Sequence, residues 1–525
     1  MKIVLAEKVS PATLAVFQAE PGLDVLTHDQ VKDLPAALKD ADALVVRSAV
    51  QVDDALMAAA PKLRVIGRAG VGVDNIDAEA ATRRGIVVMN TPGANAVAVA
   101  ELTVGLMVAL ARQIPRADST MHAGQWEKKS LQGGELRGKK LGILGLGRIG
   151  LEVARRARSF GMELLGHDPF VSASIARENA IRLVSTEELF AQADYLTLHV
   201  GLTPQTAGIV NSATLATMKK GIRIINCARG ELVVEKDLAE ALRSGHVAGA
   251  ALDVFHEEPL KNSPFTALPN VILTPHIAGS TAEAQEAVGV QIALQVREYL
   301  KSGVAQNAVN LPSLTHEEYQ ELAPYMTLAE RLGTFLAQFP KGGIESISIA
   351  YHGRLAEMKT DLLRNCAIAG VLGHLEQVNR INAASVASER GIRVHEEKKE
   401  APFGGAGSVF QLCLHTTSAE IEASGAVLHG ESPRLLRLDG IDIEAPLQGT
   451  LLAIRNRDVP GVIGRIGTIL GEHQINIANF ALGRSNGGTE STALAVLQID
   501  GEVTDAVLAE LRAAPAITGV RQVTL

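Results

Sequence analysis

A glycine-rich turn between two apolar runs is the feature that most constrains how this chain folds. Gly145-x-Gly147-x-x-Gly150 follows a strand-like run that begins at Lys139, and a helical pattern comes after it. A second apolar run then leads into Asp168. This order of strand, glycine turn, helix, strand and acidic residue is typical of a dinucleotide-binding βαβ unit.

Each residue type in this unit has a physical role. Gly145 allows the tight turn, Gly147 lets backbone N–H groups approach a pyrophosphate, and Gly150 allows helix and strand to pack closely. The helix N-terminus offers free donors and partial positive charge to the phosphates. Asp168 is placed to accept hydrogen bonds from both ribose hydroxyls. The two residues after Asp168 are uncharged, so no cation there would offset the repulsion between Asp168 and a 2′-phosphate. We therefore predict NAD rather than NADP.

The chain is too long for one hydrophobic core, since 525 residues correspond to three or four domains. A net charge of −8 without a long basic run argues against nucleic acid as a partner. The three cysteines, Cys227, Cys366 and Cys413, lie far apart and form no CxxC pair, so we expect a reducing compartment and no metal site. The N-terminus lacks a signal-peptide core and no stretch is long enough to span a membrane, which predicts a cytoplasmic protein.

Apolar runs alternate with amphipathic segments through the first 312 residues, which predicts parallel β-sheets covered by helices on both faces. In the first part, the predicted strands are Lys2–Ala6, Ala43–Val46, Leu63–Ile66, Ile86–Met89 and a returning strand at Asn307–Pro312. After the nucleotide unit, they are Tyr195–Val200, Ile222–Asn226, Gly249–Asp253 and Val271–Leu273. Ser280 and Glu283 form a capping-box pattern, which predicts that a long helix begins there.

These elements predict a doubly wound Rossmann domain of residues 98–287 inserted in a smaller α/β substrate domain of residues 1–97 and 288–312. The two crossings make a hinge, with a cleft between the domains. Residues 316–445 are predicted to be an α+β domain, with a polar segment around 395–399 and a loop at 402–408. Residues 449–525 follow the order βαββαβ, which is typical of a ferredoxin-like domain that can pair with a second copy.

Three residues outside the glycine turn suit one reaction. Arg229, Glu258 and His276 each lie just past a predicted strand, and loops at the carboxyl ends of strands face the ligand crevice in such sheets. The guanidinium of Arg229 can bind a carboxylate through two hydrogen bonds. His276 can exchange the proton of a substrate hydroxyl, and Glu258 can orient its imidazole and stabilise the cationic form. Hydride would then pass to a nicotinamide.

The motifs Gly-Leu-Gly-Arg-Ile-Gly150, Asn-Cys-Ala-Arg-Gly230, Asp253-Val-Phe-His-Glu-Glu-Pro259 and Thr-Pro-His-Ile-Ala-Gly279 resemble signatures of the D-isomer-specific 2-hydroxyacid dehydrogenases. The resemblance covers essentially the whole chain, in a long form with an intervening domain and a C-terminal ACT domain. It implies Arg229, Glu258 and His276 as the catalytic set. The further positions that it implies are Arg148, Ile149, Cys227 and Asp253 for the cofactor, and Arg47, Arg68 and Asn95 for the substrate.

The resemblance also implies an activity and a regulator. It points to NAD-dependent oxidation of D-3-phosphoglycerate to 3-phosphohydroxypyruvate, the first step of L-serine biosynthesis, by a homo-oligomer, for which a tetramer is favoured and a dimer remains open. Asp458 and Asn476 match ACT-domain positions that bind serine as a feedback effector, although an ACT domain used only for dimerisation remains open. Two other functions also remain open: reduction of hydroxypyruvate, glyoxylate or 2-oxoglutarate, and a non-enzymatic NAD-sensing regulator.

Overall fold

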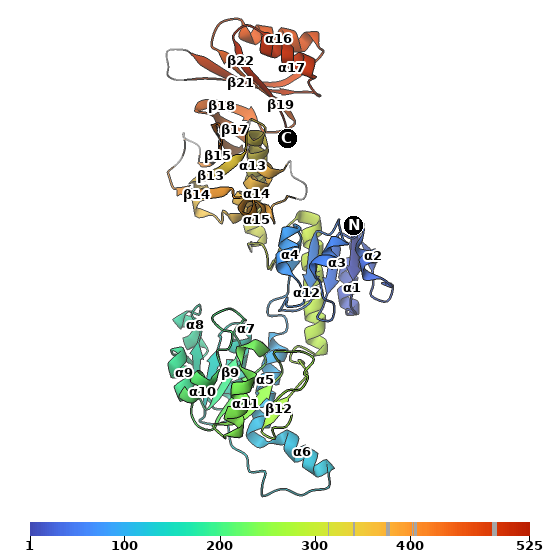
Figure 1. Ribbon diagram of the computed structural model, residues 1–525, viewed down its shortest axis with the longest axis vertical. Helices are drawn as coiled ribbons and strands as arrows, with labels where there is room; N and C mark the ends of the chain where they lie inside the picture. The colour runs from blue at the N-terminus through green and yellow to red at the C-terminus, as the bar shows by residue number, and fades with distance from the viewer. Residues whose placement is uncertain (313, 340–341, 374–377, 402, 404–406, 486–490) are drawn as a thin grey trace.

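Four β-sheets follow one another along an elongated molecule (Figure 1). The computed structural model describes residues 1–525 except 313, 340–341, 374–377, 402, 404–406 and 486–490. The nucleotide-binding sheet lies at one end, the ACT domain at the other, and the N-terminal sheet and the intervening domain lie between them. The predicted α/β class, with a doubly wound domain followed by an α+β and a ferredoxin-like domain, is confirmed.

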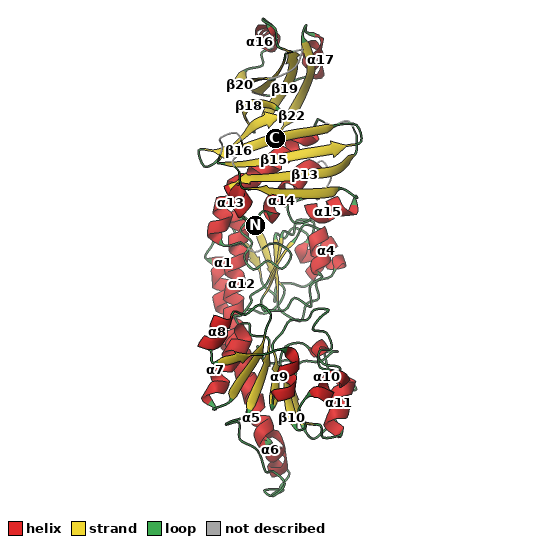
Figure 2. Cartoon of the chain, turned by 90° about the vertical axis from the view of Figure 1, so that its left-hand side faces the viewer, coloured by secondary structure: helices red, strands yellow, loops and turns green. Residues whose placement is uncertain are grey.

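The N-terminal sheet has five parallel strands in the order β2-β1-β3-β4-β5. Its strands are β1 (Lys2–Leu5), β2 (Asp24–Leu26), β3 (Ala43–Val46), β4 (Val65–Arg68) and β5 (Val87–Met89). The helices of this domain are α1 (Pro11–Gln18), α2 (Leu34–Leu38), α3 (Asp54–Ala58), α4 (Ala78–Arg83) and the returning α12 (Ala282–Ser302). Helices α1 and α12 lie side by side against the sheet (Figure 2). The chain therefore returns to this domain through α12.

Two local predictions in this domain were wrong. The segment 307–312 makes an isolated antiparallel bridge between Ala308 and Met89 instead of a strand. The reason is that the Asn310 side chain accepts from Val88 N at 2.9 Å and donates to Ile86 O at 2.8 Å, which replaces ladder hydrogen bonds. Helix α12 is capped by Thr281 rather than Ser280, because the Thr281 hydroxyl accepts from Ala284 N.

The nucleotide-binding sheet has seven parallel strands in the order β12-β11-β10-β9-β6-β7-β8. They are β6 (Lys140–Leu144), β7 (Glu163–His167), β8 (Ile181–Leu183), β9 (Tyr195–Leu198), β10 (Ile222–Asn226), β11 (Val247–Leu252) and β12 (Val271–Leu273). The helices are α5 (Ala96–Arg112), α6 (Ile114–His122), α7 (Arg148–Ser159), α8 (Ala173–Glu178), α9 (Thr186–Gln192), α10 (Ser212–Thr217) and α11 (Glu235–Arg243). The strand order reverses between β6 and β9, where doubly wound sheets bind dinucleotides.

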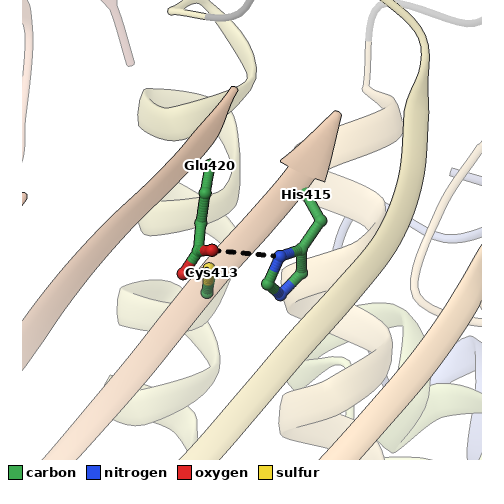
Figure 3. Close-up of side chains that lie close together, drawn as sticks. All are labelled: Cys413, His415 and Glu420. Atoms are coloured by element: carbon green, nitrogen blue, oxygen red, sulfur yellow. Dashed lines mark hydrogen bonds and ion pairs between the residues drawn. The ribbon is translucent and has the colours of Figure 1, made fainter. Parts of the chain in front are cut away.

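The intervening domain has a six-stranded sheet in the order β14-β13-β15-β16-β17-β18. Its strands are β13 (Ile344–Gly353), β14 (Arg393–Lys399), β15 (Ser408–Thr416), β16 (Glu420–Leu428), β17 (Ser432–Leu438) and β18 (Ile441–Pro446). Its helices are α13 (His316–Ala337), α14 (Asp361–Leu372) and α15 (Ala383–Glu389). Helices α13 and α14 pack on one face, and the opposite face carries Cys413, His415 and Glu420 (Figure 3).

The polar segment predicted around residues 395–399 is in fact part of β14, the edge strand parallel to β13. Most of its side chains are exposed, so the backbone ladder rather than an apolar pattern holds it in the sheet. The loop predicted at 402–408 lies largely outside the described residues.

The ACT sheet has the order β20-β21-β19-β22. Its elements are β19 (Thr450–Arg457), α16 (Val462–Glu472), β20 (Ile477–Arg484), β21 (Thr492–Ile499), α17 (Asp505–Ala513) and β22 (Ile517–Thr524). This is the predicted βαββαβ fold. Its helices cover one face, and residues of the other face join the core of the intervening domain.

Within the described part of the chain, no single helix is long and apolar enough to cross a membrane. Only α5 and α6 together reach that length and composition, as a pair bent by 65°.

Candidate active site

The glycine turn leaves an open space at the N-terminus of α7. Gly145 has φ +96, and a Cβ there would lie 2.6 Å from the carbonyl oxygen of His199. A Cβ on Gly150 would lie 2.1 Å from the carbonyl oxygen of Gly145, so the strand and helix meet too closely for any larger residue. Gly147 caps the helix with nothing within 4 Å of its Cβ position. The turn therefore has room for a pyrophosphate beside free N–H donors.

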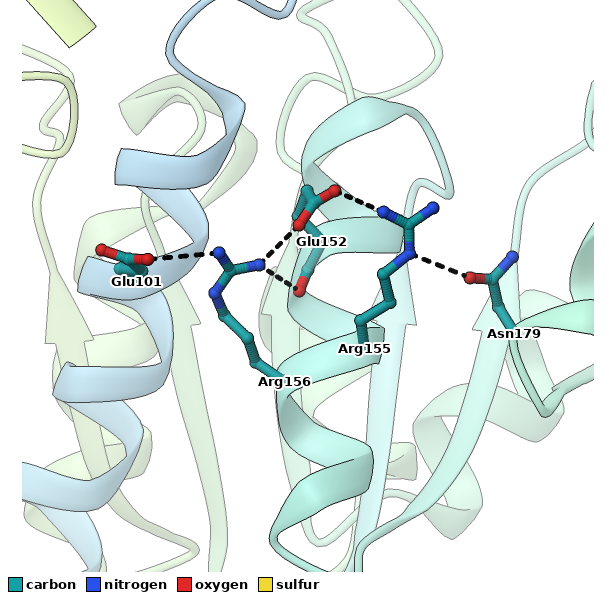
Figure 4. Close-up of polar contacts among 5 residues, drawn as sticks. All are labelled: Glu101, Glu152, Arg155, Arg156 and Asn179. Atoms are coloured by element: carbon teal, nitrogen blue, oxygen red, sulfur yellow. Dashed lines mark hydrogen bonds and ion pairs between the residues drawn. The ribbon is translucent and has the colours of Figure 1, made fainter. Parts of the chain in front are cut away.

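The nucleotide helix is tied to the helix that enters the domain. Arg156 on α7 contacts Glu101 on α5 at 3.2 Å and also pairs with Glu152 on its own helix (Figure 4). The hydrogen bonds that Arg156 donates to Glu152 and to Glu101 raise its pKa. The network fixes α7 against α5, and it thereby fixes the glycine turn relative to the chain crossing between the two domains.

Asp168 lies directly after β7, beside the glycine turn. Its two carboxylate oxygens accept hydrogen bonds from Leu146 N and Phe170 N, each at 2.8 Å. The carboxylate is therefore held in place by the turn itself. This position is where an adenosine ribose meets the second strand of a Rossmann unit.

His276 and Glu258 form the hydrogen-bonded pair predicted from the sequence. Nδ1 of His276 lies 2.7 Å from Glu258 Oε2, and the other carboxylate oxygen accepts from Phe255 N at 3.0 Å. The His276 side chain is about half exposed, with 53% of its surface accessible. Within the described chain, Nε2 of His276 has no hydrogen-bond partner. This nitrogen is therefore free to exchange a proton with a substrate in the cleft.

Asp253 organises the loop that carries His276. It is fully buried, and it accepts from the Thr274 hydroxyl at 2.6 Å and from the backbone N–H groups of Ile277 and Ala278 at 2.9 Å. Its carbonyl also accepts from His276 N at 2.9 Å. The carboxylate is thus largely occupied by its own chain, so its first role is to position the histidine loop; the predicted cofactor contact remains a prediction.

Arg229 follows β10 in the nucleotide domain and reaches a residue of the N-terminal domain. One terminal nitrogen donates to Ala228 O at 2.7 Å, and the other lies 3.1 Å from a carboxylate oxygen of Asp74 in the N-terminal domain. A Cβ at Gly72 would lie 2.1 Å from that second nitrogen. The glycine therefore lets the loop after β4 approach the guanidinium.

The predicted substrate residues Arg47 and Arg68 belong to the N-terminal domain and lie near Arg229. Nε of Arg68 is buried without a hydrogen-bond partner, and burial lowers the pKa of this guanidinium. Arg47 and Arg229 add like charge near it, while Asp74 and Glu7 oppose that charge. The side-chain oxygen of Asn95 is also buried and unpartnered. Arginines and an orphaned amide oxygen suit an anionic ligand that brings its own donors and acceptors.

Gln285 also contacts the predicted site residues, although no sequence motif marks it. Its side-chain oxygen accepts from Arg47 Nη2, and its amide donates to Gly279 O at 2.9 Å, three residues after His276. It therefore links a predicted substrate residue to the histidine loop. Its position in the first turns of α12 belongs to no chemical motif, so only the packing of two distant segments could show this link.

The other predicted cofactor residues lie around the glycine turn. Arg148 donates to the carbonyl of Pro92 and packs against Gly93, at the crossing between domains. Ile149 is partly buried against the core of the nucleotide domain. Burial raises the pKa of the Cys227 thiol to about 12, so this side chain is neutral at pH 7; its predicted cofactor contact remains a prediction.

The predicted effector residues flank α16 in the ACT domain. Asp458 lies between β19 and α16, and a carboxylate oxygen is 3.3 Å from Arg484 Nε. Asn476 lies just before β20 and donates to Asp500 at 2.7 Å. Both polar groups are tied to their own domain by these contacts.

Comparison with known proteins identifies three sequence families along the chain. Residues 104–278 match the NAD-binding domain of D-isomer specific 2-hydroxyacid dehydrogenases, residues 321–439 match the D-3-phosphoglycerate dehydrogenase intervening domain, and residues 450–516 match the ACT domain. The chain is 41% identical over 529 residues to D-3-phosphoglycerate dehydrogenase of Methanocaldococcus jannaschii, with 100% of both chains covered. It is 36% identical to the Bacillus subtilis enzyme of that name, covering 100% of this chain and 99% of the relative. The chain belongs to the D-3-phosphoglycerate dehydrogenase family.

Solved structures support the same assignment for the first two domains. A D-lactate dehydrogenase from Aquifex aeolicus, in complex with NAD and lactic acid, matches with a TM-score of 0.53 and 26% identity, over 60% of this chain and 100% of that chain. The chain is therefore an NAD-dependent dehydrogenase of the D-2-hydroxyacid type, as predicted. The matched family segments fall inside the predicted domains, whose bounds remain predictions, as do the roles of the individual site residues.

Proposed function

We propose that this member of the D-3-phosphoglycerate dehydrogenase family oxidises D-3-phosphoglycerate to 3-phosphohydroxypyruvate with NAD, at the entry to serine biosynthesis. The observation that carries the proposal is the meeting of Arg229, which follows β10, with Arg47 and Arg68 of the N-terminal domain, while the His276–Glu258 pair follows the next strands of the sheet that carries Arg229. A carboxylate and a phosphate on one substrate need more than one cation, and three arginines supply the positive charge.

Each residue has one task in this reaction. Arg229 binds the substrate carboxylate, which places the hydroxyl-bearing carbon next to it. Nε2 of His276 takes the hydroxyl proton, and Glu258 holds the imidazole through Nδ1 and stabilises the charge that develops. Arg47 and Arg68 bind the phosphate end. Gly145–Gly150 and Asp168 would hold NAD, which would supply the acceptor for the hydride of the hydroxyl-bearing carbon.

A substrate panel tests this proposal. Steady-state rates are compared for D-3-phosphoglycerate, D-glycerate, D-lactate and 2-hydroxyglutarate with NAD, and in reverse for hydroxypyruvate, glyoxylate and 2-oxoglutarate. We expect kcat/KM to be highest for the phosphorylated acid. Equal turnover of unphosphorylated glycerate would refute phosphate recognition, and a complete lack of turnover on every acid would favour the NAD-sensing alternative.

We further propose that the assembly is a homotetramer that serine inhibits through paired ACT domains. Two exposed apolar side chains, Val459 and Ile463, lie next to Asp458 and offer a surface for a second ACT domain. Helix α6 lies at the other end of the molecule (Figure 1). The exposed apolar side chains there are Met121 on this helix and Trp126 just after it. Two separate apolar surfaces suit two kinds of subunit contact, as a tetramer requires.

A further inference from the structure

The polar face of the intervening sheet brings three potential metal ligands together. Cys413 and His415 lie two residues apart on β15, and Glu420 at the start of β16 is the direct cross-strand partner of His415 (Figure 3). Because Leu412 and Leu414 belong to the core under the helices, Cys413 and His415 point to the opposite face. A sulfur, an imidazole nitrogen and a carboxylate oxygen therefore face one another across the hairpin.

The distances between these atoms suit a tetrahedral metal ion. Cys413 Sγ lies 3.4 Å from Glu420 Oε1, and His415 Nδ1 lies 3.5 Å from Glu420 Oε2. All three ligand atoms lie within 4.8 Å of one another. Bonds of about 2.0–2.3 Å at tetrahedral angles place neighbouring zinc ligands roughly 3.2–3.8 Å apart. Because the two contacts use different oxygens of Glu420, its carboxylate must turn so that one oxygen faces both Cys413 and His415.

The surroundings support a cation at this point. Nε2 of His415 lies 3.1 Å from the Ser348 hydroxyl. The hydroxyl oxygen can accept a hydrogen bond from Nε2–H, which leaves Nδ1 unprotonated to bind a metal, as outer-shell partners commonly do. Glu422 and Asp439 add negative charge near Cys413. Asp439 is itself paired with Arg455, which offsets part of this charge.

We propose that Cys413, His415 and Glu420 form a binding site for a divalent transition metal of the zinc type, with one coordination position left for water. As the metal–sulfur bond forms, the S–H bond of Cys413 breaks and its proton passes to solvent. The bound ion joins β15 to β16 across the turn at residues 417–419 and stabilises this hairpin. The sequence predicted no metal site because the three ligands do not form a CxxC-type motif, and only the strand register brings them together.

Cobalt titration of the full chain tests the proposal, because Co²⁺ in a tetrahedral thiolate site gives a sulfur-to-metal charge-transfer band. Protein stripped with a chelator is titrated with Co²⁺ and then with Zn²⁺, with inductively coupled plasma measurement of bound metal. We expect one ion per chain, a charge-transfer band and displacement by Zn²⁺. The absence of such a band in the wild-type protein would overturn the proposal.

Variants separate this site from other metal-binding groups. Cys413→Ser should remove the charge-transfer band, and Glu420→Gln and His415→Gln should each weaken affinity by at least about tenfold. Glu444→Gln makes the same charge change on β18, in the same sheet, and should bind like the wild type. Affinity that is unchanged in both Glu420→Gln and His415→Gln would refute the site.

Alkylation of the wild-type protein gives a second measurement if Cys413→Ser folds poorly. Zn²⁺ should slow iodoacetamide modification of Cys413, read by peptide mass spectrometry, with Cys227 and Cys366 as internal controls. Modification of Cys413 at the same rate with and without Zn²⁺ would contradict metal binding by this thiol.

Discussion

His276 is one of the few residues other than glycine with a left-handed backbone, φ +53. Such a conformation costs of order 1 kcal/mol or more and persists only where the surroundings enforce it. Here the buried Asp253 enforces it, because its carboxylate and carbonyl together accept from the backbone of residues 276–278. A single carboxylate at the end of β11 therefore sets the position of the proposed proton acceptor.

Substitution His276→Gln should lower kcat by about 10²–10⁴-fold, because the amide cannot take the substrate proton. NAD affinity, measured by calorimetry, should change little, since the imidazole is not part of the glycine turn. A kcat close to that of the wild type would remove His276 from the proposed role.

Substitution Asp253→Asn should both destabilise the nucleotide domain and lower kcat. An amide presents N–H groups where the carboxylate now accepts, which leaves a buried backbone donor unpaired at a cost of about 1–3 kcal/mol. Urea unfolding followed by domain-specific hydrogen exchange measures the first effect, and steady-state kinetics measures the second. A variant with normal activity and stability would show that the loop holds its shape without this residue.

Helix α12 returns the chain to the first domain and also links two predicted parts of the active site. Its residue Gln285 joins Arg47, 238 positions earlier, to the loop that carries His276. The helix is thus in contact with both sides of the cleft. By comparison, α13 begins with a reciprocal capping box between Thr315 and Glu318, a local signal from which its start can be read in the sequence.

Substitution Gln285→Ala should reduce kcat/KM for the phosphorylated substrate by about tenfold, equivalent to 1.4 kcal/mol. The reason is that Arg47 loses its acceptor and Gly279 loses its donor, so both sides of the cleft become less ordered. Glu286→Ala, an exposed neighbour on the same helix, is the matched control. Equal kcat/KM in the wild type and the Gln285 variant would show that this link has no part in substrate binding.

At the scale of the whole molecule, the ACT domain lies at the far end from the nucleotide sheet (Figure 1). The intervening domain connects to the first domain through side chains next to α15. Asn379 donates to Gly85 O, Asn382 donates to Arg83 O and Arg380 donates to Gly303 O. Any effect of an ACT ligand on the cleft has this joint as a direct physical connection, and subunit contacts as another.

Substitution Asn476→Ala tests the effector site. If serine binds at Asp458 and Asn476, the variant should need at least about tenfold more serine for half-inhibition, since one good hydrogen bond to a charged group contributes about 1.5–3 kcal/mol. Basal kcat should stay unchanged because the site is remote from the cleft. Inhibition by serine with an unchanged midpoint would place the effector elsewhere.

The sequence determined the local features of this protein. Glycine spacing and the acidic residue after β7 predicted the Rossmann unit, and apolar periodicity predicted the βαββαβ unit. These predictions succeed because turn geometry and burial depend on residues that are close together in the sequence. The same local signals placed Arg229, Glu258 and His276 at strand ends. These signals did not predict the edge strand β14, because its side chains are exposed and follow no apolar pattern. They wrongly predicted a strand at 307–312, because the side-chain hydrogen bonds that replace the backbone ladder there cannot be read from the sequence pattern.

Only the tertiary structure decided which distant residues meet. The contact of Arg229 with Asp74, the link from Arg47 through Gln285 to Gly279, and the cluster of Cys413, His415 and Glu420 all depend on domain packing or strand register. Chain connectivity constrains such pairs weakly, since the entropy of closing a loop grows only slowly with its length. The glycine turn thus predicts nucleotide binding from the sequence alone, while the tertiary structure determines which residues of the N-terminal domain lie near it.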